Sequence, residues 1–109
     1  MRISKELAKG SNGMLVLSVL EKGDKYGYLI VKEIANLSDN VFSMNEGTLY
    51  PILHSLEKEG YLEAYWVEAE NMRKRKYYRI TEKGRKELAA QKTEWKSYST
   101  AVEKVLGYV

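Results

Sequence analysis

The chain has 109 residues, enough for one domain with a modest core. Apolar residues make up 44% of it and charged residues 30%, which excludes a disordered chain. The net charge of +3 is too small to establish a polyanionic partner by itself. Because there are no cysteines, a disulfide framework and a thiolate metal site are excluded.

The sequence predicts neither a membrane span nor a secretory signal. The longest apolar run, residues 14–20, is interrupted by Ser18 and is too short to cross a bilayer. The first ten residues, MRISKELAKG, lack the apolar stretch of a signal peptide. We therefore expect a cytoplasmic protein.

Two helices are predicted in the first third of the chain. The first runs from about residue 4 to residue 21, although Gly10 and Gly13 weaken it, since glycine inside a helix costs about 0.5–1 kcal/mol relative to alanine. Gly23 and Asp24 end this helix. The second helix runs from about residue 27 to residue 36. Its predicted apolar side consists of Leu29, Ile30, Ile34 and Leu37.

A third helix is the clearest element of the chain. Leu49, Ile52, Leu53 and Leu56 recur at helical spacing and form one apolar face. Gly60 fits the position just after the end of a helix, where glycine is favoured.

The start of this third helix has two possible caps. Ser43 and Glu46 can form a capping box, and Asn45 is the alternative cap. Pro51 falls within the first or second turn, where its missing N–H is tolerated.

A hairpin follows the third helix. Residues 61–69 alternate as a strand, and residues 75–80 return after a polar turn. In the return strand, Tyr78 and Ile80 are expected on one side, and Tyr77 and Arg79 on the other. The order of helix and two-stranded wing predicts a domain that presents a helix to the DNA major groove and a basic arm to the phosphates.

The last helix, capped by Thr81, carries a seven-residue repeat. One series consists of Leu88, Trp95, Val102 and Val109. The second, interleaved series consists of Gln91, Tyr98 and Val105. Such a repeat is typical of a helix that packs along another helix. No other long element remains to cover it, so the simplest partner is the same helix of a second subunit.

These elements predict a mainly α (α+β) fold, a winged helix-turn-helix with an N-terminal helix and one long C-terminal dimerisation helix. The winged helix DNA-binding domain is expected in residues 1–80 and the dimerisation helix in residues 81–109.

An enzyme is not predicted. The single histidine, His54, adjoins Ser55, and neighbouring residues of a helix point in different directions, so the two cannot form a nucleophile–base pair. There is no HExxH sequence, no phosphate-binding glycine loop and no paired carboxylates in an apolar context. We expect no catalytic residue, no metal site and no cofactor.

Nucleic-acid binding is the favoured function. The exposed side of the third helix offers small and polar side chains to bases, and the basic strand adds affinity through counterion release. The predicted DNA contacts are Asn45, Gly47, Thr48, Tyr50, Pro51, His54, Lys58, Arg73, Lys74, Arg75, Lys76 and Tyr77.

The alternative is a protein-interaction module. In that case the winged helix docks a protein. Independently of this alternative, His54 can be a solvated surface residue, and the basic strand can serve only to deter aggregation at a sheet edge. The basic wing would then be incidental to the function.

Trp95 also has two interpretations. Either it packs in the dimer seam, or two copies leave a flat apolar slot that accepts planar aromatic compounds. The residues predicted for the ligand site and dimer interface are Leu7, Met14, Ser18, Leu88, Gln91, Trp95, Tyr98, Ser99 and Val102.

Three motifs of the chain resemble the PadR family of bacterial transcriptional repressors. GTLYPILHSLEKEGYL in residues 47–62 looks like the family's recognition helix and first wing strand. RKYYRITEKGRKEL in residues 75–88 is similar to its second wing strand and the start of its C-terminal helix. KYGYLIVKEI in residues 25–34 is similar to its second helix.

The resemblance implies a homodimeric winged helix repressor that binds a palindromic operator. The single C-terminal helix is similar to the short subgroup, in whose multidrug-sensing branch a tryptophan at the position of Trp95 stacks on planar drugs. The chain departs from this pattern at two points. Its wing tip has no glycine, and Ser99 stands where the drug-sensing branch has an acidic residue, which argues against cationic effectors.

Overall fold

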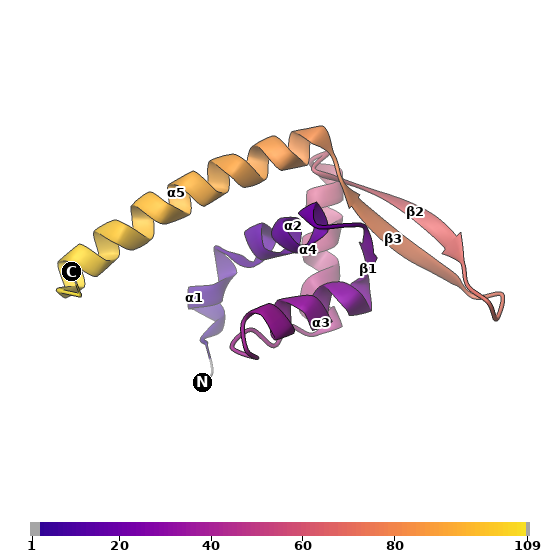
Figure 1. Ribbon diagram of the computed structural model, residues 1–109, viewed down its shortest axis with the longest axis horizontal. Helices are drawn as coiled ribbons and strands as arrows, with labels where there is room; N and C mark the ends of the chain where they lie inside the picture. Colours follow the sequence, from indigo (N-terminus) through magenta and orange to yellow (C-terminus); the bar gives the residue numbers. More distant parts are fainter. Residues whose placement is uncertain (1–2, 109) are drawn as a thin grey trace.

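The computed structural model describes residues 3–108, which form five helices and one three-stranded sheet. In chain order the elements are α1 (Lys5–Lys9), α2 (Asn12–Glu21), β1 (Lys25–Tyr26), α3 (Gly27–Leu37), α4 (Glu46–Lys58), β2 (Leu62–Glu68), β3 (Lys74–Ile80) and α5 (Glu82–Leu106). The β2–β3 hairpin projects from one side of the helical body, and α5 extends to the other (Figure 1). This arrangement is the mainly α winged helix that the sequence predicts.

The predicted first helix is in fact two helices, so that expectation was wrong. α1 ends at Lys9 and α2 begins at Asn12, with Gly10 and Ser11 between them. The Ser11 hydroxyl donates to the carbonyl oxygen of Ala8 at 3.2 Å, which gives the backbone an alternative to a continuous helix. α1 buries none of its residues, and Leu7 is 73% exposed.

The sheet contains a strand that the sequence analysis did not predict. β1 has only two residues and pairs antiparallel with β3, in the order β1–β3–β2. A two-residue strand is too short to show an alternating pattern. β2 and β3 pair over their full length, from Leu62 opposite Ile80 to Glu68 opposite Lys74. As predicted, Tyr78 and Ile80 share the side of β3 that faces the core, where both are 4% exposed.

The core lies between the sheet and four of the helices. Its buried members are Val16, Leu17, Val19, Leu20, Ile30, Ile34, Leu49, Leu53, Leu56, Leu62, Tyr78, Ile80 and Leu88. The sequence predicted an apolar side for α3, and its members Ile30 and Ile34 are indeed buried. Leu37, also predicted on this side, is 58% exposed, because it is the last residue of the helix and lies beyond the core.

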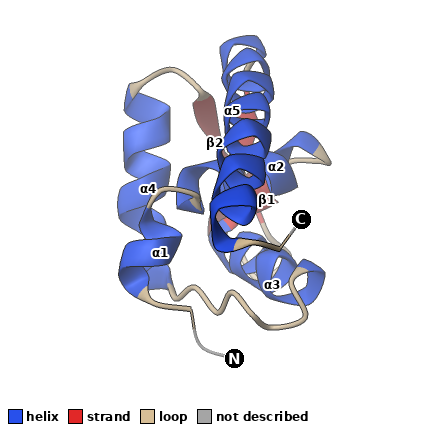
Figure 2. Ribbon diagram, turned by 90° about the vertical axis from the view of Figure 1, so that its left-hand side faces the viewer, coloured by secondary structure: helices blue, strands red, loops and turns tan. Residues whose placement is uncertain are grey.

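The N-terminal half of α5 is fixed to the body, and its C-terminal half is not. Leu88 is buried, and Glu21 of α2 forms ion pairs with Arg85 at 3.8 Å and Lys92 at 3.7 Å. Beyond this contact α5 leaves the body. Figure 2 shows α5 foreshortened in front of the body, with α1 and α4 to one side of it and α3 below its C-terminal end.

The end of α4 and the start of α5 are joined by hydrogen bonds. Gly60 has a φ of +82°, which confirms its predicted place after the end of α4. The Thr81 hydroxyl donates to the Gly60 carbonyl at 2.7 Å, and the Thr81 N–H donates to the Tyr61 carbonyl at 3.0 Å. Thr81 also caps α5 as predicted, because its hydroxyl accepts the Gly84 N–H at 3.0 Å.

Candidate nucleic-acid interface

The N-terminus of α4 is capped by Asn45, the second of the two predicted caps. Its side-chain oxygen accepts the Thr48 N–H at 2.9 Å. The capping box of Ser43 and Glu46 is therefore not the cap observed, since Glu46 is already the first residue of the helix. The cap holds the Asn45 side chain against the first turn of α4.

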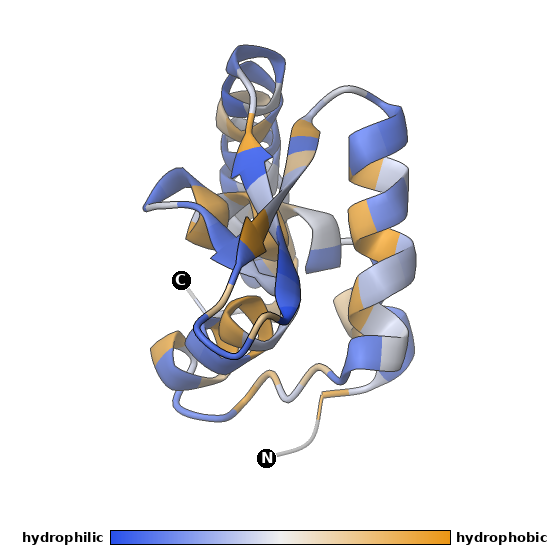
Figure 3. Ribbon diagram, turned by 90° about the vertical axis from the view of Figure 1, so that its right-hand side faces the viewer, coloured by the Kyte–Doolittle hydropathy of each residue, from blue (hydrophilic) through white to orange (hydrophobic). Residues whose placement is uncertain are grey.

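The remaining predicted contacts on α4 lie on its solvent-exposed side. Leu49, Leu53 and Leu56 bind the helix to the core, and Ile52 is partly buried beside them. The exposed residues are Glu46, Gly47, Thr48, Tyr50, Pro51, His54, Ser55 and Lys58. Pro51 lies in the second turn, where it lacks the N–H that would donate to the Gly47 carbonyl. α4 stands beside the hairpin (Figure 3), and the ion pair between Glu57 of α4 and Lys76 of β3 joins the two.

The Tyr50 side chain, unlike a fully solvated one, contacts another helix of the body. It is 47% exposed, but its hydroxyl lies over Gly27 at the start of α3, so that a Cβ at Gly27 would come within 2.9 Å of it. The absence of a side chain at Gly27 therefore lets Tyr50 lean across from α4 to α3.

The turn between α3 and α4 is built without glycine. Asp39 and Asn40 have φ values of 52° and 65°, a conformation that these two residue types tolerate better than most. The Phe42 N–H donates to the Ser38 hydroxyl at 3.0 Å, and Phe42 and Met44 pack against the core. These contacts position α4 against α3 as the second helix of a helix-turn-helix.

Two residues near α4 were missed by the sequence analysis. Lys9 and Asn12 line a shallow groove together with Thr48, Pro51 and Ser55 of α4. The break between α1 and α2 brings them there, and no sequence motif marks them. They place a cation and an amide beside the exposed side of α4.

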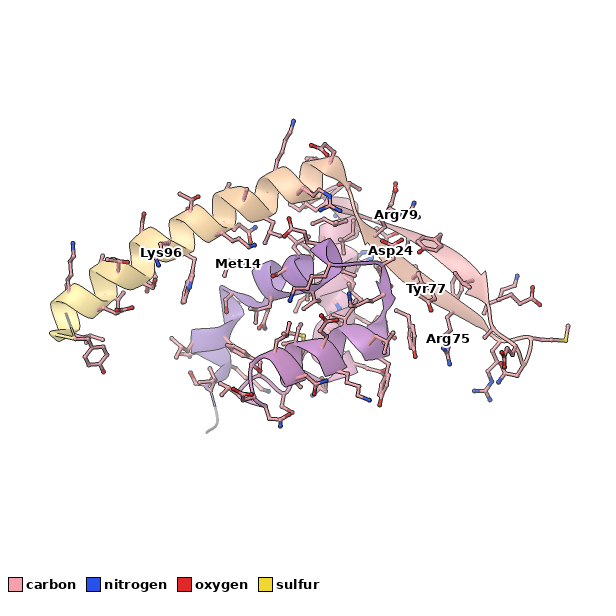
Figure 4. The ribbon with its side chains drawn as sticks, viewed as in Figure 1. Met14, Asp24, Arg75, Tyr77, Arg79 and Lys96 are labelled. Atoms are coloured by element: carbon pink, nitrogen blue, oxygen red, sulfur yellow. The ribbon has the colours of Figure 1, made fainter. Side chains whose placement is uncertain are left out.

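The basic run of the wing is divided by strand alternation. Arg75, Tyr77 and Arg79 lie on the outer face of the sheet, while Lys74 and Lys76 share the inner face with Tyr78. Figure 4 shows Arg79, Tyr77 and Arg75 following one another along the hairpin, with Asp24 beside Arg79.

Three of these cations have partners within the chain. The Arg75 guanidinium lies 4.5 Å from the centre of the Tyr26 ring. Lys76 Nζ lies 3.8 Å from Glu57 Oε1. Arg79 pairs with Asp24 at 3.2 Å and with Glu63 at 3.5 Å. Within residues 3–108, Arg73 and Lys74 at the tip form no ion pair and no cation–π contact.

Aromatic rings cover the outer face of the sheet. Tyr77 is in edge contact with Tyr26 at 5.5 Å and stacks on Tyr65 at 5.8 Å. Tyr77, a predicted DNA contact, is therefore held at the base of the wing, between β1 and β2. The Tyr65 hydroxyl donates to Asp24 at 2.6 Å, and this bond raises the pKa of Tyr65 above its usual value. The same carboxylate raises the pKa of Arg79.

On the inner face, burial of Tyr78, aided by nearby Glu57, raises the pKa of its phenol. Ionisation of Tyr78 is therefore disfavoured where it contacts the core. The Lys76 ammonium lies 5.5 Å from the centre of its ring.

The predicted dimer and ligand residues are only partly accessible on α5. Leu88 was expected in the interface, but it is 1% exposed because the core of its own chain covers it. The exposed stripe starts later, with Trp95 at 49% and Tyr98 at 63%, whose rings are 6.1 Å apart. Val102 continues it, whereas Val109 lies outside the described residues.

The other predicted members of the interface differ in exposure. Gln91 is partly buried and donates to Glu87 at 2.6 Å, and the Ser99 hydroxyl donates to the Lys96 carbonyl at 3.3 Å. Met14 and Ser18 of α2 are partly buried, and Leu7 of α1 is exposed.

Two kinds of feature are absent from the part of the chain that the structure describes. No group of three or more potential ligands could hold a metal ion there. None of the helices between residues 3 and 108 has the length and apolar character that crossing a membrane requires.

Comparison with known proteins decides the family. The model of the transcriptional regulator PadR-like family matches residues 16–90, from α2 to the N-terminal half of α5. The chain belongs to this family. The PadR-like proteins are DNA-binding transcriptional regulators and not enzymes, which confirms both sequence-based predictions.

Solved structures agree with this assignment. The chain is 35% identical to a transcriptional regulator from Clostridium thermocellum, with a TM-score of 0.85 and coverage of 91% of this chain and 96% of that one. It is 37% identical to a PadR family regulator from Eggerthella lenta, with a TM-score of 0.80 and coverage of 93% and 86%. It is 30% identical to a PadR-like regulator from Bacillus cereus, with a TM-score of 0.79 and coverage of 93% and 96%.

The wing tip of this PadR-like protein departs from the glycine that the resemblance implies. Met72 takes a φ of +63° there, a conformation that is unfavourable for a residue with a side chain. The Met72 N–H donates to the Ala69 carbonyl at 3.0 Å, and the Ala69 N–H donates to the Arg73 carbonyl at 2.7 Å. These two bonds close the turn in the absence of glycine.

Proposed function

We propose that this protein is a homodimeric transcriptional repressor that binds a palindromic operator. In this proposal α4 enters the major groove and the wing contacts the phosphates on either side. The observation that carries the proposal is the exposed side of α4, which lies beside a hairpin whose tip cations form no ion pair and no cation–π contact in the described chain.

The proposed base-reading residues are Asn45, Gly47, Thr48, Tyr50, Pro51, His54 and Lys58. Two copies joined through α5 would place two such helices about 34 Å apart and read half-sites one turn of DNA apart. The exposed stripe of Trp95, Tyr98 and Val102 supports α5 as the dimer interface, because an apolar surface of this kind gains stability when a partner covers it. Such a repressor acts in the cytoplasm, where bacterial DNA is found.

The test of DNA binding starts by selecting duplexes from a random pool with the wild-type protein. The dissociation constant for the selected duplex is then measured by fluorescence anisotropy at several salt concentrations. We expect a two-fold symmetric site and a steep fall of affinity with salt, since each neutralised phosphate contributes about 0.9 to the log–log slope. No selection of a common sequence would refute operator binding.

Charge reversal separates this proposal from a protein-interaction module. Arg73→Glu combined with Lys74→Glu should abolish binding to the selected duplex. The matched control combines Lys22→Glu with Lys86→Glu, two exposed cations outside α4 and the wing, and should retain most of the affinity. If both double variants bind equally, the wing is incidental.

We further propose that an uncharged planar aromatic effector binds beside Trp95 and releases the DNA. The tilted, half-exposed pair of Trp95 and Tyr98 supports this, since it offers a stacking surface, and Ser99 provides no carboxylate for a cation. Tryptophan quenching by uncharged polycyclic dyes tests it in a Trp66→Phe background, where Trp95 is the only remaining tryptophan. Quenching without loss of DNA affinity would refute the effector role.

A further inference from the structure

The distal half of the wing extends beyond the support of the sheet. β1 pairs only with Tyr77 and Tyr78 of β3, so the hairpin has two strands from residue 76 to the tip. A two-stranded hairpin without further packing is marginally stable at best. Side-chain contacts must therefore hold this part in place.

One contact supports the outer face of the distal wing. The Arg75 guanidinium lies 4.5 Å from the centre of the Tyr26 ring, and Tyr26 in turn meets Tyr77 edge-on. We call this pair of Arg75 and Tyr26 the outer wing contact. It joins the unsupported part of β3 to β1.

A second contact supports the inner face. Lys76 Nζ lies 3.8 Å from Glu57 Oε1 on α4, and both side chains are a little over one-third exposed, at 38% and 37%. We call this ion pair the inner wing contact. It joins the same part of β3 to the C-terminal turn of the recognition helix.

The strand that carries Tyr26 is itself fixed to the helical body. Lys25 Nζ donates to the Val19 carbonyl at 2.9 Å and to the Gly23 carbonyl at 3.0 Å, and it pairs with Glu33 of α3 at 3.4 Å. The Lys25 side chain is only 13% exposed. Tyr26 is thus anchored to the helical body, and the outer wing contact fixes the wing relative to the helix-turn-helix.

From this arrangement we propose that Tyr26 and Glu57 are positioning residues for DNA binding. They hold Arg75 and Lys76, which fixes the angle of the wing, and the phosphate contacts are made by Arg73 and Lys74 at the tip. This inference rests on the proposed DNA binding and deepens it. It reassigns Arg75 and Lys76, which the sequence analysis predicted as direct phosphate contacts.

The proposal predicts a change in the salt slope opposite to the one expected if only the charges near DNA mattered. Tyr26→Ala changes no charge and would release Arg75. If Arg75 itself contacted a phosphate, the variant would keep the wild-type salt slope or make it steeper. As a positioning residue, Tyr26 is needed to place the tip, so Tyr26→Ala should reduce the slope by about 0.9 to 1.8 per subunit, the share of one or two tip contacts.

Glu57→Gln provides a second variant that does not depend on the aromatic cluster. Removing a negative charge beside DNA ordinarily strengthens binding. The proposal predicts weaker binding and a reduced slope, because Lys76 loses its ion pair with α4 and keeps only its contact with the Tyr78 ring of its own strand. Since Glu57 is not in the buried core, this variant should fold even if Tyr26→Ala does not.

The experiment also measures the wing without DNA. Because the wild-type chain has no cysteine, Asn71→Cys at the exposed tip gives a single site for a nitroxide spin label. The label should become more mobile in Tyr26→Ala and in Glu57→Gln. The control Tyr26→Phe keeps an aromatic face for Arg75 and should match the wild type in both label mobility and salt slope.

Three outcomes overturn the proposal. In the first, the spin label at the tip is no more mobile in Tyr26→Ala and Glu57→Gln than in the wild type. In the second, the label becomes more mobile but the salt slope on the selected duplex does not change. In the third, Tyr26→Phe has the same effects as Tyr26→Ala. Failure of the underlying function is recognised separately, because in that case the wild-type protein binds no duplex while the mobility measurement still reports on the two wing contacts.

Discussion

Replacing Gly84 with alanine perturbs the junction between α4 and α5. Gly84 lies in the first turn of α5, directly against the backbone of Tyr61. A Cβ built there overlaps the Tyr61 carbonyl oxygen and comes within 2.8 Å of Ile80 Cγ1. The obstacle is backbone, which cannot rotate away as a flexible side chain can, so α5 would have to shift by roughly 1 Å.

The size of the effect follows from three contributions. Overpacking of this kind costs about 3 kcal/mol at the upper end of its usual range. The shift also strains the hydrogen bond from the Thr81 N–H to the Tyr61 carbonyl, which contributes about 1 kcal/mol. Alanine regains about 1 kcal/mol because it favours the helix more than glycine does. We therefore expect a net destabilisation of about 3 kcal/mol, which lowers Tm by about 12 °C or more.

The assay is thermal unfolding followed by circular dichroism at one protein concentration, since the proposed dimerisation would make Tm depend on concentration. Gly10→Ala is the matched control, because its Cβ would meet no atom within 4 Å and its φ of −77° suits alanine. It should be neutral or stabilising by up to about 1 kcal/mol. If Gly84→Ala unfolds at or above the wild-type temperature, the packing argument at this junction is wrong.

Three further predictions concern the proposed dimer seam on α5, the cap of α4 and the base of the wing. Trp95→Ala should weaken dimerisation by about 30-fold, near 2 kcal/mol, in sedimentation equilibrium, and an unchanged constant would remove Trp95 from the seam. Asn45→Ala should lower the free energy of unfolding by about 1 kcal/mol in urea, while Asn45→Asp should restore it. Because the bond to Asp24 raises the pKa of Tyr65, its stabilisation is complete below pH 10 and is lost as the pH rises further. Tyr65→Phe should therefore lose less stability above pH 10 than the wild type, and an equal loss in both would argue against this bond.

The sequence was most informative where a residue type has one dominant structural role. The leucine spacing of α4, Gly60 after its end and the cap at Thr81 are local patterns, and each is observed as predicted. The alternation of β3 also placed Tyr78 and Ile80 correctly in the core.

Local patterns failed where two weak signals competed. Residues 4–21 have enough apolar character for one helix, but the break at Gly10 and Ser11 depends on which residues find a core to cover them, and α1 finds none. β1 was missed because two residues carry no periodicity, and it exists only because β3 supplies its hydrogen-bonding partner.

The sequence by itself determined the winged helix, the basic character of the hairpin and the repeat on α5, because these depend on spacing along the chain. Only the tertiary structure decided which residues of the repeat and of the basic run are free to contact a partner molecule. Leu88 belongs to the repeat but is covered by its own core, and Arg75 and Lys76 belong to the basic run but lie against Tyr26 and Glu57. These partners lie at least 19 residues away along the chain, and burial and charge pairing depend on distances in space that no local pattern contains.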